Sequence, residues 1–284
     1  MKVKIIVDST ADMPLEMKER ISVVPLTIRF GDQEFIDGVT IDSKQFYEML
    51  VECDQLPTTS QASPFVFSEA YEQALKEADQ VVVLTVSSRL SGTYQSAAIA
   101  AEEHPGKVYV VDSQSVAIGT GILAQYALKL ADRGLDAEEI AWRLMQKRED
   151  IRVIAMLDTL EYLKKGGRIS ATAALAGGLL NIKPVISIEN GEIRMLGKAR
   201  GSRQANNLLV QEIGKAGGVD FDKPLLLGYT GLSDVLLQKY IRDSAQLWEG
   251  NREALPFAVI GSVVGTHAGP GAVAVAFFSK NGTN

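Results

Sequence analysis

Hydroxyl side chains gather in two short stretches, each placed just ahead of an expected helix. Ser87–Thr93 reads SSRLSGT and follows a buried strand expected over Val81–Val86. Thr58–Gln61 reads TTSQ and precedes Ser63 and Pro64, which suit the N-cap and first position of a helix. The free N–H groups and positive dipole end of a helix N-terminus favour a bound anion. Both stretches are therefore candidate sites for a carboxylate or a phosphate.

A purely structural explanation of these hydroxyls stays open. Ser91 is a residue of the type preferred at N-caps and can serve only to begin its helix. Asp8–Thr10 present the same choice at the end of the strand expected over Val3–Val7. Ligands of open α/β sheets gather at the carboxyl ends of strands, whereas a Ser or Thr there can equally cap the helix expected near Pro14.

The chain has two histidines, and one of them lies in a segment suited to a ligand. His104 precedes Pro105 in an expected surface turn. His267 lies in Gly265–Gly271, which we expect to be a glycine-rich loop between two apolar strands. Backbone can approach a ligand closely in such a loop, and the imidazole can donate a hydrogen bond to an anion. A structural hydrogen bond is the alternative role of this side chain.

Residues Gly119–Ala124 match the G-x-G-x-x-A pattern of dinucleotide-binding folds. The first glycine, however, comes eight residues after the strand expected over Val108–Val111, and an amphipathic helix to Ala131 follows. The pattern binds a pyrophosphate only in a tight turn between a strand and a helix. We therefore expect no dinucleotide site here.

Composition indicates a cytoplasmic globular protein of two domains. The chain has 284 residues, of which 46% are hydrophobic and 23% are charged, and this length suits two separate cores. The net charge of −6 argues against a nucleic-acid partner. Cys53 is the only cysteine, which excludes an internal disulfide and fits a reducing compartment. Because no apolar run reaches about 18 residues and the chain opens on a strand, we expect no signal peptide, no membrane span and at most a transient membrane contact.

Strands and helices alternate as far as Lys147, an order that predicts a parallel sheet with helices on both faces. The order changes after Arg152, where Asn190-Gly191 joins two extended runs into an expected hairpin, and a hairpin among helices indicates a mixed sheet. We therefore predict an N-terminal domain of residues 1–155 and a C-terminal domain of residues 156–284. Further expected strands cover Ser22–Phe30, Val153–Leu157, Leu225–Leu227, Ala258–Val264 and Val273–Phe278, and further helices cover Asp42–Cys53, Ala137–Lys147, Ser202–Lys215 and Ser233–Trp248.

Six motifs follow one another along the chain: VDSTAD (Val7–Asp12), TSQ (Thr59–Gln61), SSRLSGTYQSA (Ser87–Ala97), VDSQ (Val111–Gln114), LKKGGRIS (Leu163–Ser170) and THAGPGAV (Thr266–Val273). In this order and spacing they resemble the DegV family, the fatty-acid-binding subunits of bacterial fatty acid kinase. The resemblance covers essentially the whole chain. It departs at Ala62, where many members have proline after TSQ, a change that affects the loop and not its hydroxyls.

The resemblance implies an N-terminal α/β/α domain with a parallel sheet and a C-terminal two-layer α/β domain with a mixed sheet, the EDD fold. It implies that one long-chain fatty acid lies buried with its carboxylate at the domain interface. By motif, Thr59, Ser91 and His267 would bind the carboxylate, and Arg168 would offset its charge. It implies no catalytic residue, no metal and no cofactor, because a separate ATP-dependent kinase subunit would convert the bound acid into an acyl phosphate.

The energetics of burial support a fatty acid independently. A chain of about fifteen methylenes gains on the order of 12 kcal/mol on burial, before the costs of ordering and association. The carboxylate then needs hydrogen-bond donors in place of water, because an unpaired buried charge is costly. The small apolar run Ala171–Leu180 is a candidate wall of the tunnel, or else packs within its own domain.

Two other classes of function stay open. A serine hydrolase would use Ser91, His267 and Asp112; the chain lacks the G-x-S-x-G motif, but a triad is defined by geometry. A regulatory module would instead sense a lipid and bind some other protein.

A kinase subunit would need a docking surface beside the carboxylate. The basic residues Lys198, Arg200 and Arg203 lie between an expected strand and an expected helix. Charges at the rim of an interface chiefly set the association rate and its salt dependence. We expect Arg200 and Arg203 to form this docking surface, with a merely solvated surface as the alternative.

Overall fold

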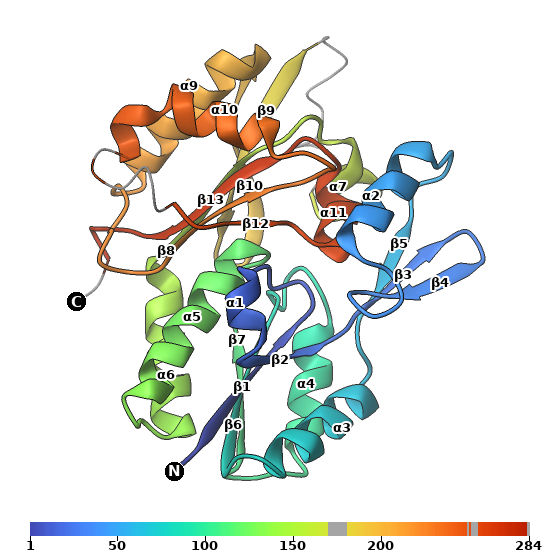
Figure 1. Cartoon of the computed structure of the whole chain (residues 1–284), viewed down its shortest axis with the longest axis vertical. Helices are drawn as coiled ribbons and strands as arrows, with labels where there is room; N and C mark the ends of the chain where they lie inside the picture. Colours follow the sequence, from blue (N-terminus) through green and yellow to red (C-terminus); the bar gives the residue numbers. More distant parts are fainter. Residues whose placement is uncertain (170–180, 249, 251–254, 283–284) are drawn as a thin grey trace.

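The computed structural model describes residues 1–169, 181–248, 250 and 255–282, and these residues form three sheets (Figure 1). The first sheet has four strands, all paired in parallel. In spatial order they are β2 (Ile21–Val24), β1 (Val3–Asp8), β6 (Gln80–Thr85) and β7 (Val108–Asp112). Near-continuous apolar runs in β1 and β6 are the pattern of strands that are buried on both faces.

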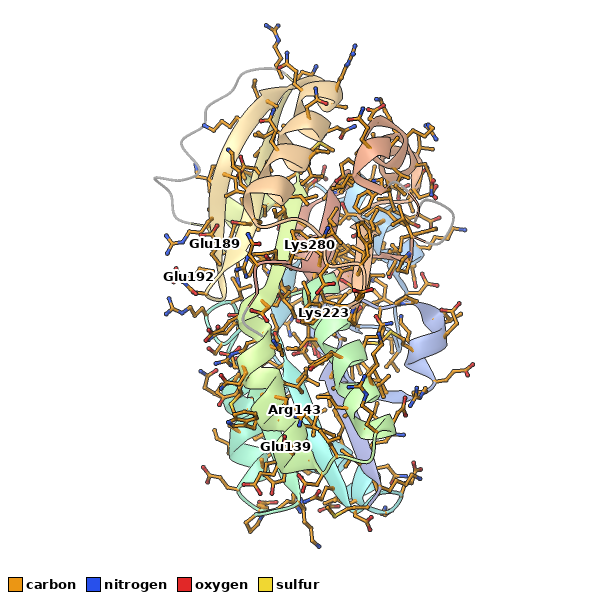
Figure 2. The ribbon with its side chains drawn as sticks, turned by 90° about the vertical axis from the view of Figure 1, so that its left-hand side faces the viewer. Glu139, Arg143, Glu189, Glu192, Lys223 and Lys280 are labelled. Atoms are coloured by element: carbon orange, nitrogen blue, oxygen red, sulfur yellow. The ribbon has the colours of Figure 1, made fainter. Side chains whose placement is uncertain are left out.

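Helices cover both faces of this parallel sheet. Ile5 and Val7 of β1 belong to the core on one face, and Ile6 belongs to the core on the other. Figure 2 shows Glu139 and Arg143 on the outer side of one covering helix, whose apolar residues face the sheet. The first face is covered by α5 (Ile118–Asp132) and α6 (Ala137–Lys147), and the second by α3 (Pro64–Leu75) and α4 (Thr93–Ala101).

The second sheet has six strands and is mixed. Its strands are antiparallel except for the last pair, and in spatial order they are β10 (Glu192–Arg200), β9 (Ile182–Glu189), β8 (Ile151–Met156), β13 (Val273–Phe278), β11 (Leu225–Tyr229) and β12 (Phe257–Val259). Its outer face packs against α9 (Gly201–Lys215) and α10 (Val235–Asp243). The predicted fold class, a parallel α/β/α unit followed by a mixed-sheet α/β unit, is confirmed.

Two features join the parallel sheet to the mixed sheet. Helix α5 is buried on most of its surface because it packs against strands of both sheets. The predicted hairpin turn at Asn190-Gly191 forms, with φ of 50° and 80°, between Glu189 and Glu192 (Figure 2). The buried Ser87 hydroxyl, just beyond β6, donates a 2.8 Å hydrogen bond to the Gly191 carbonyl. The hairpin tip is thereby fixed to the carboxyl end of the parallel sheet.

A third, antiparallel sheet lies beside these two. Its strands are β4 (Gln33–Ile36), β3 (Thr27–Phe30) and β5 (Thr58–Ser60), with β3 in the middle. In the described part of the chain, the remaining helices are α1 (Leu15–Lys18), α2 (Ser43–Glu52), α7 (Glu161–Lys165) and α11 (Ser262–Ala268), with 3₁₀ turns η1 (Arg148–Asp150) and η2 (Ala245–Trp248).

Four predicted elements differ from the structure. The run Ser22–Phe30 is two strands in two sheets, interrupted around Pro25, and Thr58–Gln61 is mostly strand β5 rather than a loop. The strand expected over Ala258–Val264 ends at Val259 and gives way to α11. The helix expected over Ser233–Trp248 ends at Asp243 and a 3₁₀ turn follows.

Two predictions remain beyond test. The division at residue 155 stays a prediction; β8, which spans it, belongs to the mixed sheet. The expected tunnel wall Ala171–Leu180 lies outside the described residues. Among the helices that the structure describes, none is long and apolar enough to cross a membrane.

Candidate functional site

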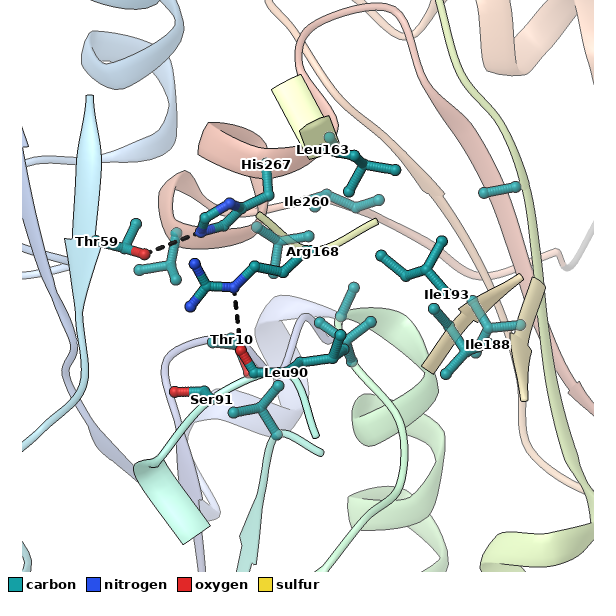
Figure 3. A pocket seen from close by; sticks show the side chains of 18 of the residues that line it. Thr10, Thr59, Leu90, Ser91, Leu163, Arg168, Ile188, Ile193, Ile260 and His267 are labelled. Atoms are coloured by element: carbon teal, nitrogen blue, oxygen red, sulfur yellow. Dashed lines mark hydrogen bonds between the residues drawn. The ribbon is translucent and has the colours of Figure 1, made fainter. Parts of the chain in front are cut away.

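A cavity of about 390 Å³ lies between the inner face of the mixed sheet and the carboxyl ends of β1 and β6 (Figure 3). This volume falls in the range of about 300–1,000 Å³ that is usual for small-molecule sites. Strand β8 contributes every second residue, Val153 and Ala155, as the two-residue repeat of a strand requires, and β9 contributes Ile186, Ser187 and Ile188. The apolar wall includes Val153, Ala155, Ile186, Ile188, Ile193 and Ala274.

All four predicted carboxylate-site residues line this one cavity. Thr59, Ser91, Arg168 and His267 come from four separate segments of the chain and gather at one end of it (Figure 3). Ile188 and Ile193 lie toward the other end in the same view. The cavity therefore has a polar end and an apolar body, which is the shape of an amphiphilic ligand.

His267 lies on a helix, not in the loop that its glycine-rich surroundings predicted. The start of α11 is held from the N-terminal half of the chain. Asp12 Oδ1 accepts a 2.8 Å hydrogen bond from the Gly261 N–H, and the Tyr47 hydroxyl donates one of 2.8 Å to the Ile260 carbonyl. Gly269 ends the helix with φ of 71°, and a Cβ there would lie 2.3 Å from the Tyr162 ring. These contacts fix the imidazole at the cavity.

The imidazole of His267 is neutral at pH 7. Its Nε2 lies 2.9 Å from Thr59 Oγ1, while Nδ1 is buried and has no hydrogen-bond partner among the described residues. Burial and, second, the neighbouring Arg168 cation lower the pKa of His267 from 6.5 to about 4. The ring thus contributes a hydrogen bond to the site rather than a charge.

Arg168 supplies the positive charge at the polar end. Its Nε donates a 3.1 Å hydrogen bond to the Leu90 carbonyl, and its Nη1 donates one of 2.7 Å to the Gly166 carbonyl. The guanidinium lies between His267 and Ser91 in Figure 3. It therefore bridges the end of α7 and the loop that precedes α4.

Ser91 lies one residue ahead of the helix cap, because the N-cap of α4 is Gly92. Its hydroxyl lies 2.8 Å from Thr93 Oγ1 and accepts a 3.3 Å hydrogen bond from the Thr93 N–H. Gln61 packs over Gly92 and donates a 3.0 Å hydrogen bond to Ser96, so β5 and α4 are tied together beside the site. Capping alone does not describe Ser91, whose side chain also lines the cavity.

The three side chains of the hydrolase alternative do not assemble into a triad. Asp112 accepts hydrogen bonds from the Ser88 N–H and hydroxyl and from the Gln114 N–H, at 2.5–3.1 Å. In the described part of the chain, neither Asp112 nor Ser91 is hydrogen-bonded to His267, whose ring instead meets Thr59. The geometry required for an activated serine is absent from this arrangement.

Several residues that shape the site were not found from the sequence. Asp12 and Tyr47 hold the start of α11, and Gly166 accepts a hydrogen bond from Arg168. These residues act through their neighbours, and such indirect roles cannot be read from a sequence motif. The alternation of apolar and polar residues over Ile186–Ile188 could have indicated a wall, whereas Val153–Ala155 is apolar throughout and gives no such signal. Arg200 and Arg203 are both exposed, at the junction of β10 and α9, and do not line the cavity.

Comparison with known proteins agrees on one family. A family model described as an uncharacterised protein of the DegV family matches residues 2–280. A DegV domain-containing protein of Caldanaerobacter subterraneus subsp. tengcongensis is 36% identical over 98% of this chain and 99% of its own. A solved DegV family protein of Thermus thermophilus, described by its fatty acid binding, has a TM-score of 0.87 at 32% identity and covers 98% of this chain and 100% of its own. The fatty acid kinase B3 protein of Streptococcus pneumoniae, solved with linoleic acid, has a TM-score of 0.84 at 27% identity, with 98% and 99% coverage.

The low pKa of His267 predicts how stability depends on pH. Between pH 6.5 and about 4 the unfolded chain binds a proton at this residue and the folded chain does not. The contribution of His267 is therefore complete above pH 6.5 and falls by about 3 kcal/mol as the pH drops through this interval. Urea unfolding of the wild type and of His267→Gln across this range measures it. A difference between the two proteins that stays constant with pH would contradict the neutral, buried imidazole.

Proposed function

The chain belongs to the DegV family, and from this premise we propose that it binds one long-chain fatty acid, with the acyl chain in the cavity and the carboxylate at its polar end. The observation that carries the proposal is the convergence of Thr59, Ser91, Arg168 and His267 on one end of an otherwise apolar cavity. Fatty acids are the ligands of solved proteins with this fold. A fatty acid has both the long apolar part and the single anionic group that this cavity suits.

Each polar group has a separate role toward the carboxylate. When His267 Nε2–H donates to Thr59 Oγ1, the Thr59 hydroxyl proton is free to point at a carboxylate oxygen. Ser91 offers a second hydroxyl from the opposite side of the cavity end. Arg168 balances the negative charge, which would otherwise be costly to hold away from water. The site binds a carboxylate with neutral hydroxyl donors and one cation.

We propose further that the bound acid is presented to a separate ATP-dependent kinase subunit, which forms the acyl phosphate. The similarity to a fatty acid kinase B3 protein supports a kinase partner. The lack of a serine triad among the described residues supports a chain that presents its ligand and does not convert it. A cytoplasmic location fits this role and the single cysteine, Cys53.

Protein purified from a bacterial host without added lipid should carry about one fatty acid per chain. Dissociation must return the buried methylenes to water, so affinity appears mainly as slow release. Mass spectrometry of an organic extract identifies and counts the ligand. Ala155→Leu, which places a larger side chain in the cavity wall, should lower the amount or shorten the acyl chain. A clean extract from protein that also fails to bind added long-chain fatty acid would refute the proposal.

Removal of a donor should weaken carboxylate binding. Ser91→Ala and His267→Ala should each weaken fatty acid affinity by roughly 1–3 kcal/mol, the usual cost of an under-satisfied charged acceptor. The double variant should lose less than the sum, because both residues serve one ligand. Ser68→Ala serves as the control and should bind as the wild type does, because this half-buried serine of α3 hydrogen-bonds Glu103 and does not line the cavity. Wild-type affinity in both single variants would remove these residues from the site.

Charge reversal should separate docking from lipid binding. Arg200→Glu with Arg203→Glu should slow phosphorylation of the bound acid by a kinase subunit, most at low salt, and leave fatty acid affinity unchanged. The matched control reverses Lys129 and Arg133, which are exposed on α5 and at its end, far from β10 and α9 (Figure 1). Equal phosphorylation rates in the two double variants at low salt would place the interface elsewhere.

A further inference from the structure

Gly166 lies in close contact with the imidazole of His267. A Cβ at position 166 would lie 2.2 Å from His267 Nδ1 and 2.9 Å from its Cε1, distances at which atoms overlap. The backbone itself does not demand glycine, because Gly166 has φ of −73° and ψ of −8°, in the right-handed helical region. Glycine is therefore required at this position for the space that the ring occupies.

The neighbouring glycine shows the contrast. Gly167 has φ of 69°, and a Cβ there would meet nothing within 4 Å. Gly167 is thus explained by backbone conformation and Gly166 by a close approach. Glycine is thus needed at these two adjacent positions for different physical reasons.

The main-chain carbonyl of Gly166 contacts Arg168, the charged residue of the site. This carbonyl accepts the 2.7 Å hydrogen bond from Arg168 Nη1. The Gly166 N–H donates a 2.8 Å hydrogen bond to the Tyr162 carbonyl, which fixes the residue at the end of α7. The same residue therefore touches the imidazole with its α-carbon and the guanidinium with its carbonyl.

The contact also bears on which ring nitrogen carries the proton. Nδ1 faces Gly166, and no described residue offers it a hydrogen-bond acceptor. A proton on Nδ1 would be a buried donor without a partner, whereas a lone pair there costs less. The proton of the neutral ring then sits on Nε2, where Thr59 Oγ1 accepts it at 2.9 Å.

We propose that Gly166 is a positioning residue of the carboxylate site: its bare α-carbon seats the His267 ring and selects the Nε2–H form, and its carbonyl sets the place of Arg168. The consequence is that Thr59 receives a proton from His267 and turns its own proton toward the ligand. The part of this proposal that concerns the fatty acid rests on the proposed function. The contact between Gly166 and the His267 ring, and the proton on Nε2, do not depend on it.

Gly166→Ala tests the contact between Gly166 and the His267 ring, and Gly214→Ala is its matched control. Gly214 lies inside α9, and a Cβ there would meet nothing within 4 Å. The chain has two histidines, so ¹⁵N spectra of the imidazoles resolve His267 with His104 as an internal reference. We expect the Nε2–H form with a pKa of about 4 in the wild type and in Gly214→Ala. In Gly166→Ala we expect a mixture of the Nδ1–H and Nε2–H forms. We also expect the pKa of His267 to rise toward 6.5, because the ring is displaced from its buried position.

Affinity and a double variant complete the test. Fatty acid affinity should fall about tenfold in Gly166→Ala. In a His267→Ala background Gly166→Ala should have little further effect, because the methyl group takes the place of the ring and only the Tyr162 carbonyl, 3.1 Å from the added Cβ, stays close. If Gly166→Ala does not fold, the Gly166→Ala/His267→Ala double variant should, and failure of both to fold would overturn the proposal. Unchanged His267 signals and pKa in a folded Gly166→Ala would overturn it as well. A wild type that binds no fatty acid but shows the expected spectra would refute the proposed function and still support the role of Gly166 in positioning the His267 ring.

Discussion

The hydrogen bond between Thr59 and His267 joins segments that lie 208 residues apart in the sequence. Thr59 belongs to β5 of the three-stranded sheet, and His267 belongs to α11, which leads into β13 of the mixed sheet. Asp12 and Tyr47 hold the other end of α11 from the N-terminal half of the chain. The polar end of the cavity therefore exists only when all three sheets are assembled, so binding a ligand there stabilises the whole fold rather than one part of it.

The loop after β1 supports the site without supplying its donors. Asp8 accepts hydrogen bonds from the N–H groups of Thr10 and Val86, and so fixes the start of the loop that carries Ser91, while Asp12 fixes the helix that carries His267. Burial raises the pKa of Asp8 and, more strongly, the pKa of Asp12, because each carboxylate is held away from water. This destabilising burial occurs where the two segments that carry Ser91 and His267 are positioned together at the cavity.

Local sequence patterns predicted the parallel sheet and the mixed sheet but not the three-stranded one, and motif resemblance named Thr59, Ser91, Arg168 and His267, which all line one cavity. Helix α11 was missed for a physical reason. Glycines normally disfavour a helix, but Gly265 is needed where a Cβ would lie 2.6 Å from the Tyr47 hydroxyl and 2.8 Å from the Phe46 ring. That requirement is tertiary, so no local window of sequence reveals it. The same is true of Gly166, whose partner ring lies about a hundred residues further along the chain.

The strands of the cavity wall tie ligand fit to the stability of the mixed sheet. In β8, Val153 and Ala155 face the cavity, whereas Ile154 and Met156 face the core beneath α9 and α10. Because Val153 and Ala155 border the open cavity, a change in their size alters the space for a ligand, while Ile154 and Met156 are confined by close packing. An insertion or deletion of one residue in this strand would exchange the two sets and lose both. Substitution at the cavity-facing positions of β8 can therefore change the length and shape of the cavity, without change to its polar end.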